Sequence, residues 1–156
     1  QVNIETLVDE SLQQLDPLLK EKEVTIARRL DTGLLRVMAD PDKLRQVLVN
    51  IVKNAVEATA CDGHIEIESS FIDTNGNAGI VLTISDHGAG ISAQDLKRIF
   101  QPFFTTKKKG TGLGLCIVKK ILDAHGSSIQ VSSEEGQGTV VQLHLQGVRD
   151  EKNPHH

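Results

Sequence analysis

An aspartate at the end of an apolar strand is the side chain in this sequence best suited to holding a ligand. Alternating residues predict a strand over Gly79–Asp86. Because side chains alternate between faces, Asp86 shares the face that this strand buries. An unpaired carboxylate in an apolar layer is costly, and Gly88 and Gly90 follow at once, permitting a sharp bend and the close approach of another group. The pattern favours a ligand pocket, and a tight turn around a hydrogen-bonded aspartate is the alternative.

Two asparagines one helical turn apart form a second polar feature. Asn50 and Asn54 lie within 42–59, where apolar residues recur at steps of three and four and predict a helix with one buried face. Asparagine is a poor helix former because its amide competes for backbone hydrogen bonds. Its place here indicates either a functional pair or part of a solvated face. That face carries Lys43, Gln46, Asn50, Lys53, Asn54 and Glu57.

A basic stretch that runs into glycines is the third feature. Three lysines at 107–109 precede the sequence GTGLGL at 110–115, and helical spacing resumes over 113–122. Glycines at a helix start leave backbone N–H groups exposed at the positive end of the helix dipole, where phosphate binds. We expect a mobile loop that ends in an anion site. A run of lysines by itself would more often be a solvated surface.

The helices between these features have clear start signals. The asparagine helix has Asp40 as its N-cap and Pro41 at its first position. Another helix is predicted over 4–19, with a kink near Asp16 because Pro17 removes a backbone donor.

Alternating apolar residues and turn chemistry predict the sheet. Thr74–Asn77 is typical of a hairpin turn, and Glu134–Gly138 indicates a second hairpin. Ser92 would cap a short helix that runs through Ile99, and three phenylalanines within 100–104 are expected to plug the core. The predicted strands cover 24–30, 35–37, 65–67, 79–86, 129–131 and 141–145.

Composition limits the class of protein. The chain has 156 residues, 38% hydrophobic and 24% charged, with a formal net charge of −4. These values fit one globular domain over 1–147 with a flexible tail over 148–156, and they argue against a nucleic-acid surface. No apolar run approaches the length that crosses a bilayer, so we expect no membrane contact by this segment. Cys61 and Cys116 lack metal or redox spacing, which suits a cytoplasmic setting.

Taken in order, these signals resemble the ATP-binding catalytic domain of sensor histidine kinases, within the gyrase, chaperone, kinase and mismatch-repair ATPase superfamily. The resemblance covers nearly the whole chain. It implies the Bergerat ATP-binding fold, an α/β (α+β) two-layer sandwich with a mixed sheet of about five strands and helices on one face. The family's N box, first glycine box, F box, second glycine box and final glycine box match 42–58, Asp86–Gly90, Phe100–Phe104, Gly110–Leu115 and Gly136–Thr139.

The resemblance implies a role for each matching residue. Asp86 would accept a hydrogen bond from the adenine amine. Asn54 would hold Mg²⁺, Asn50 would lie by the phosphates, and Lys107 would neutralise charge during transfer, which makes Asn50 and Lys107 the catalytic pair. Thr139 would lie near the nucleotide, or serve only as a strand-start hydroxyl. The other expected ATP contacts are Gly88, Gly90, Ile91, Thr106, Gly110, Thr111, Gly112, Leu113, Gly114 and Leu115.

The resemblance also implies partners. None of the six histidines is followed by the acidic, Arg and Pro pattern of a phosphoacceptor helix. We therefore expect the phosphoacceptor histidine on a separate dimerisation domain of the same parent protein, with a response regulator downstream. The parent protein can be membrane-anchored while this part lies in the cytoplasm.

Other functions of the same fold stay open. Hydrolytic members usually place a glutamate one turn before the Mg²⁺-binding asparagine, whereas Asn50 stands there, and a neutral amide is no general base. Glu57 more simply fills an ordinary polar position. By the same resemblance, the stretch from Thr105 to Gly110 would be the ATP lid, and it is short. The alternatives are a serine-directed kinase of the anti-sigma type, a mitochondrial-type kinase, which this short lid disfavours, and a nucleotide-dependent interaction module without chemistry.

Overall fold

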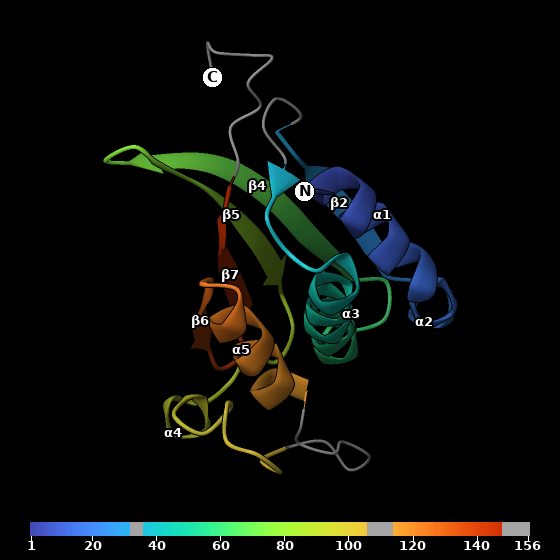
Figure 1. The fold of residues 1–156 in the computed structure, drawn as a ribbon. Coiled ribbons are helices and arrows are strands. Elements are labelled where there is room, and N and C mark those ends of the chain that lie inside the picture. Colours follow the sequence, from blue (N-terminus) through green and yellow to red (C-terminus); the bar gives the residue numbers. More distant parts are fainter. Residues whose placement is uncertain (32–35, 106–113, 148–156) are drawn as a thin grey trace.

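A five-stranded mixed sheet is the framework of the fold in the computed structural model (Figure 1). The structure describes residues 1–31, 36–105 and 114–147. The strand order is β2-β4-β5-β7-β6, in which β2 and β4 are parallel and the other neighbours are antiparallel. The bounds are β2 (Thr25–Arg29), β4 (His64–Thr74), β5 (Asn77–Asp86), β6 (Ser128–Glu134) and β7 (Gly138–Gln146).

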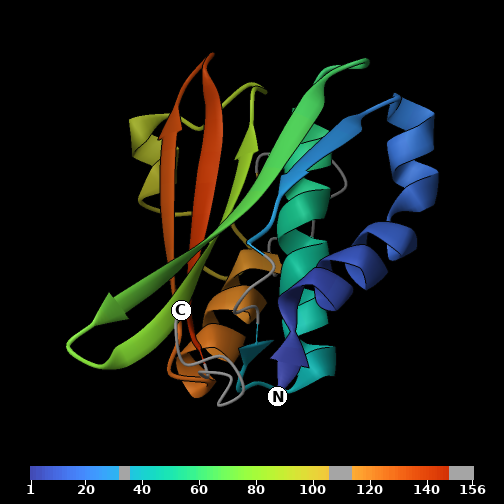
Figure 2. The same ribbon diagram turned by 90° about the horizontal axis from the view of Figure 1, so that it is seen from above.

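Helices α1, α3 and α5 lie together on one face of this sheet (Figure 2). This arrangement confirms the predicted two-layer α/β class and the mixed sheet. Two short strands, β1 (Val2–Asn3) and β3 (Arg36–Val37), pair separately. The helices are α1 (Ile4–Gln14), α2 (Asp16–Lys22), α3 (Pro41–Ala58), α4 (Ala93–Leu96) and α5 (Gly114–Ala124). Within the described ranges, no helix is both long and apolar enough to cross a membrane.

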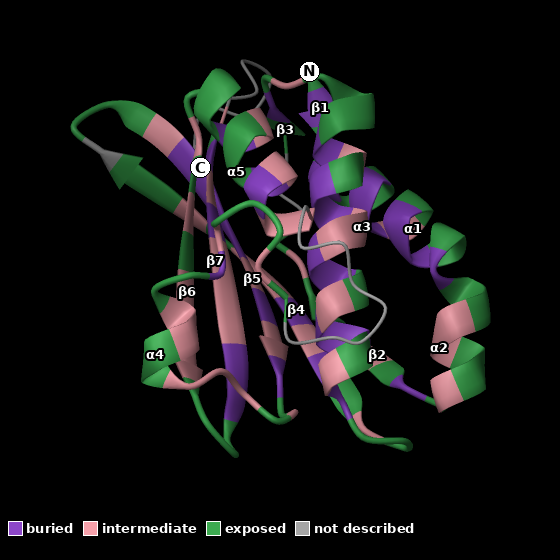
Figure 3. Cartoon of the chain, turned by 90° about the horizontal axis from the view of Figure 1, so that it is seen from below, coloured by how far each residue is buried: buried purple, intermediate pink, exposed green. Residues whose placement is uncertain are grey.

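The hydrophobic core lies between the sheet and the helices α1, α3 and α5. Figure 3 shows buried residues in both of these layers. Seven residues of α3 are buried at helical spacing, from Leu44 to Val56. On β4, Ile65 and Ile67 are almost completely buried, whereas His64 between the turn and Ile65 is exposed. Side chains alternate along each strand, so one face of the sheet is covered by helices and the other is not. We call the second face the outer face, and it carries His64, Glu66 and Ser85.

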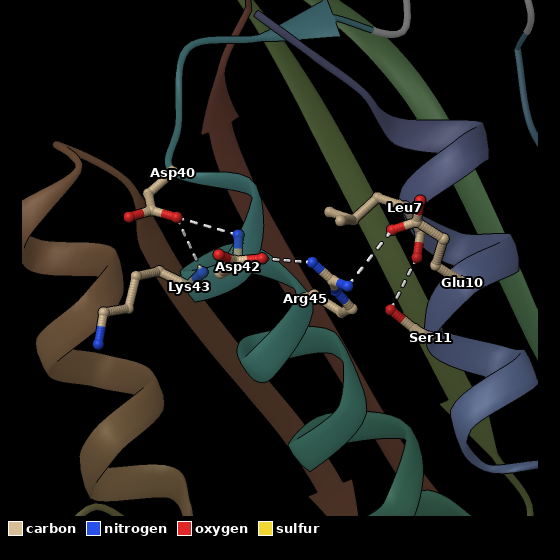
Figure 4. A network of polar contacts seen from close by, with 7 residues as sticks. All are labelled: Leu7, Glu10, Ser11, Asp40, Asp42, Lys43 and Arg45. Carbon is tan, nitrogen blue, oxygen red and sulfur yellow. Dashed lines mark hydrogen bonds and ion pairs between the residues drawn. The ribbon is translucent and has the colours of Figure 1, made fainter.

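The start of α3 is capped as predicted. The Asp40 carboxylate accepts hydrogen bonds from the N–H groups of Asp42, at 2.9 Å, and Lys43, at 3.3 Å (Figure 4). Arg45 pairs with Asp42 and also lies 3.7 Å from the Glu10 carboxylate on α1. These contacts join α1 to the start of α3.

The end of α5 is also tied to the start of α3. The Asp40 N–H donates to Nε2 of His125 at 3.2 Å, and Nδ1 of His125 lies 2.7 Å from the Ile121 carbonyl oxygen. Because Nε2 accepts a hydrogen bond, the ring hydrogen is on Nδ1, and Nδ1–H donates to the Ile121 carbonyl oxygen. His125 thus connects the end of α5 to the start of α3.

Local sequence predicted several boundaries well. The helix predicted over 4–19 breaks at Leu15, just before Pro17, and its second part continues to Lys22. Asn75 and Gly76 form the two-residue loop of the β4–β5 hairpin, both with positive φ, which this turn requires. Ser92 caps α4 as expected, but α4 ends at Leu96 rather than Ile99.

The phenylalanine cluster is the clearest wrong prediction. Phe103 is 76% exposed and has a φ of 67°, in the left-handed region. Phe104 is half-buried, with the Arg98 guanidinium 4.7 Å from its ring centre. The segment is therefore not a core plug. A run of phenylalanines in the sequence does not say which rings are buried. Here the backbone turns at Phe103, and its ring is exposed.

Candidate functional site

A row of polar side chains crosses the helix-covered face where β5 ends. Asp86 pairs with Thr139 on β7, and Thr139 pairs with Ser133 on β6. Asp86 shares its face with the buried Ile84, and Thr139 and Ser133 share theirs with the half-buried Val141 and Val131, as the alternation predicts. The inward direction predicted for Asp86 is confirmed, because its side chain is only 6% exposed among buried neighbours.

The Asp86 carboxylate is buried but hydrogen-bonded. Its Oδ1 accepts from the Gly88 N–H at 2.9 Å. Burial raises the pKa of Asp86, and the backbone donors of Gly88 and Thr139, together with neighbouring His87, act in the opposite direction. A carboxylate offers about four acceptor positions, so the bonds from these two backbone groups leave capacity for a ligand donor.

Glycines around Asp86 let three segments pack against one another. A Cβ on Gly88 would lie 2.1 Å from the Ala58 carbonyl oxygen at the end of α3. A Cβ on Gly138 would lie 2.1 Å from the Asp86 carbonyl oxygen, and one on Gly90 would lie 2.2 Å from that of Glu134. The predicted close approach at Gly88 and Gly90 therefore involves the protein's own backbone.

Hydrogen bonds hold the segment that follows Asp86. The Ala89 N–H donates to the Ala58 carbonyl at 3.3 Å, and the Ala89 carbonyl accepts from the Gly136 N–H at 2.7 Å. Ile91, a predicted site residue, donates its N–H to Ser133 Oγ at 2.8 Å. The end of α3, the glycine bend and the β6–β7 loop are thus joined around the carboxylate.

Ser133 completes this network and was missed by sequence reasoning. Its hydroxyl donates to the Gly138 carbonyl at 2.9 Å, and Thr139 Oγ1 lies 2.9 Å from the same Ser133 oxygen. Since the single hydroxyl hydrogen of Ser133 points to Gly138, Thr139 is the donor in the second bond. The hairpin register, which pairs residue 133 with residue 139, was the signal that could have identified Ser133.

The two asparagines stand apart from the other polar residues of α3. Asn50 and Asn54 are half-buried, whereas Lys43, Gln46, Lys53 and Glu57 are exposed. A fully solvated polar face would expose the asparagines equally. The two amide groups are therefore partly covered by the rest of the chain, in a helix that packs on β5 and α5.

Several predicted phosphate contacts lie outside the described residues. These are Thr106, Lys107, Gly110, Thr111, Gly112 and Leu113. Of the predicted glycine-rich stretch, the structure describes Gly114 and Leu115, which begin α5 and are half-buried. A Cβ on Gly114 would meet no atom of the described residues within 4 Å.

An open groove of about 890 Å³ lies elsewhere, between α1, α2 and β2. Leu12, Leu19 and Ile26 are among its apolar lining, and Asp16, Lys20 and Arg28 among its charged lining. Of the predicted site residues that the structure describes, none lines this groove. The groove is therefore separate from the row at Asp86.

The mixed sheet with α1, α3 and α5 on one face makes the chain a two-layer α/β sandwich, with a buried, hydrogen-bonded carboxylate beside a glycine bend at the end of β5. The family model described as "Histidine kinase-, DNA gyrase B-, and HSP90-like ATPase" matches residues 39–149. The chain belongs to this family.

Its relatives are sensor kinases. Over 144 residues, the chain is 40% identical to the sensor histidine kinase ZraS of Escherichia coli, covering 92% of this chain and 30% of ZraS. The solved catalytic domain of histidine kinase ThkA superposes with a TM-score of 0.79 at 32% identity, covering 93% of this chain and 92% of that one. Full-length ShkA in complex with AMPPNP gives 0.80 at 30% identity, covering 96% and 31%. The chain therefore spans about 30% of the length of ZraS, and it resembles the catalytic domain of ThkA over nearly its whole length.

Proposed function

We propose that this chain binds Mg-ATP and donates the γ-phosphate to a histidine on a separate helical domain of its parent protein. The observation that carries the proposal is the buried Asp86 carboxylate at the end of β5. An acceptor-only group in this position suits the exocyclic amine of adenine and disfavours the carbonyl oxygen of guanine. Support for nucleotide binding also comes from ShkA, which was solved in complex with the ATP analogue AMPPNP.

The asparagines of α3 fit a site for the metal and the triphosphate. Amide oxygens are suitable ligands for a hard cation that keeps most of its waters, and Asn54 is half-buried at one side of α3. We assign Asn54 to Mg²⁺ and Asn50 to the phosphates. Bound Mg²⁺ would neutralise charge on the phosphate oxygens.

The remaining ATP contacts are proposed from the family motifs. Lys107 would neutralise the charge that develops during transfer, and the backbone N–H groups from Gly110 to Leu115, with Thr106, would surround the phosphates. Thr139 already donates its hydroxyl hydrogen to Ser133, so we assign it a supporting contact through its remaining acceptor capacity.

Because a neutral amide stands at position 50, we expect slow release of phosphate to water by this chain alone. The phosphoryl group would instead pass to a histidine of the dimerisation domain, and from there to a response regulator. The parent's signalling role as a two-component sensor kinase belongs to this proposal, as does a cytoplasmic location for this part of it.

Calorimetric titration of Mg-ATP and Mg-GTP into the wild-type chain and Asp86→Asn tests the adenine site. We expect ATP to bind in preference to GTP. Losing a hydrogen bond to a charged group should weaken ATP binding in the variant by roughly 10- to 150-fold. Asp123→Asn, at an exposed carboxylate on α5, is the control and should bind as the wild type does. Equal binding of both nucleotides, or an unchanged affinity in Asp86→Asn, would contradict the assignment.

Transfer is tested by incubating the chain with γ-labelled ATP and the helical domain of its parent. Label that is lost in acid but retained in alkali identifies phosphohistidine. The reverse stability would indicate a serine-directed kinase. Binding of ATP without label on any acceptor would favour the interaction module instead.

A further inference from the structure

Two histidines and a glutamate gather on the outer face of the sheet, close to the end of β5. His64 and Glu66 belong to β4, and His87 follows β5. The Glu66 Oε1 atom lies 3.7 Å from His64 Nε2 and 3.9 Å from His87 Nε2. The two imidazole ring centres are 4.7 Å apart. One ligand atom from each residue lies within 4.8 Å of the others.

The strand register brings these residues together. His64 and Glu66 are two positions apart on β4 and therefore share a face. Ile65 pairs with Asp86, so the next position along places His87 opposite His64. The antiparallel pairing thus supplies the third ligand from a segment distant in sequence.

We propose that His64, Glu66 and His87 form a binding site for a divalent transition-metal ion of the Zn²⁺ class. Imidazole nitrogens and a carboxylate are the ligand set that such ions accept, and three protein ligands leave the fourth tetrahedral position to water. Bonds of about 2 Å to a shared ion require the ligand atoms to lie roughly 3.3 Å apart, so small side-chain rotations suffice.

The surroundings of the cluster leave room for a cation and place no positively charged side chain of β2 within the cluster. The side chains of His64 and His87 are each 56% exposed and that of Glu66 is 42% exposed, so water and ions can reach them. On β2, the register neighbours Thr25 and Ala27 are small and uncharged. Arg29, the next β2 residue on that face, lies 3.9 Å from Glu68 rather than in the cluster.

This site differs from the proposed Mg²⁺ position in place and in chemistry. The cluster lies on the outer face of the sheet, whereas Asn54, which we assign to Mg²⁺, belongs to α3 on the helix-covered face. Mg²⁺ prefers oxygen ligands, whereas two of the three groups here offer nitrogen. The two ions would therefore not compete for the same residues.

The test is calorimetric titration of Zn²⁺ into the metal-free chain, in a background where His155 and His156 are alanine, so that the tail offers no imidazole. We expect one ion per chain and at least tenfold weaker binding in each of His64→Asn, Glu66→Gln and His87→Asn. His144→Asn is the matched control. His144 lies on β7 and pairs with Val81 of β5, which in turn pairs with Ser70 of β4. This register level is four residues from Glu66 and six from His64, so it lies about 13 to 20 Å along the strands from the cluster.

A second measurement keeps the test independent of variant stability. Co²⁺ added to the unmutated cluster should give the visible absorption bands of a four-coordinate ion, and Zn²⁺ should displace them. Far-ultraviolet circular dichroism checks that each variant is folded. The proposal is overturned if the Co²⁺ spectrum stays that of the hydrated ion, or if folded cluster variants bind Zn²⁺ as tightly as His144→Asn does.

Discussion

Asp86 and His87 are consecutive residues, yet they end on opposite faces of the sheet in opposite environments. Asp86 is 6% exposed and is held by backbone donors from two segments. The His87 side chain is 56% exposed, and its ring lies beside His64 and Glu66. The helix-covered face accepts a polar group only where the surrounding chain is built around it, whereas the outer face accepts polar groups at little cost.

The largest expected contrast between the faces is in unfolding free energy at two adjacent residues of β4. Ile65 is completely buried, so Ile65→Ala should lower stability by about 2–5 kcal/mol. His64→Ala should change it by no more than about 0.5 kcal/mol. Urea unfolding in the presence of EDTA measures both. Similar losses at the two positions would show that the outer face is not open.

A smaller effect is expected where the backbone packs around Asp86. Gly88→Ala places a Cβ against the Ala58 carbonyl, which forces the end of α3 and the glycine bend apart. We expect a loss of about 1–3 kcal/mol in the same urea experiment. Gly114→Ala is the matched control, because its Cβ would meet no atom of the described residues within 4 Å and its stability should stay equal or rise slightly. If Gly88→Ala left the free energy of unfolding unchanged, the end of α3 and the glycine bend would not be tightly packed together.

The subtlest expectation concerns Asp86 itself. Since burial raises the pKa of Asp86, its charged form is less favourable in the folded chain than in the unfolded chain. Asp86→Asn, which removes the charge and keeps an acceptor for the Gly88 N–H, should therefore unfold at a higher urea concentration at neutral pH, while ATP binding weakens. Asp123→Asn should leave the midpoint unchanged. A destabilised Asp86→Asn would indicate that the carboxylate serves the fold rather than a ligand.

How much of this could be predicted depended on whether the signal was local. The cap at Asp40, the break before Pro17 and the Asn75-Gly76 turn are set by neighbours in sequence, and all three were confirmed. The inward direction of Asp86 followed from alternation alone. Family membership followed from five motifs in order, and the matching family model supports it.

What could not be predicted depended on distant pairing or on a single backbone angle. The parallel pairing of β2 with β4 joins segments far apart in sequence, and alternation carries no information about it. The exposed ring of Phe103 goes with a left-handed φ, and nothing in the run of aromatic residues predicts that φ. The cluster of His64 and His87 was in principle accessible, since extending the hairpin register by one pair beyond Ile65 and Asp86 brings them together.

The ends of α3 are both fastened to other parts of the chain. At its start, Asp40 N–H is bound by His125 from the end of α5, and at its finish the Ala58 carbonyl receives Ala89 from the glycine bend. Helix α3 is therefore attached at both ends, and a shift of the helix along its axis would break at least one of these hydrogen bonds. Asn50 and Asn54 are four residues apart and therefore about 6 Å apart along the axis of α3. Any movement needed during turnover consequently falls to segments other than α3.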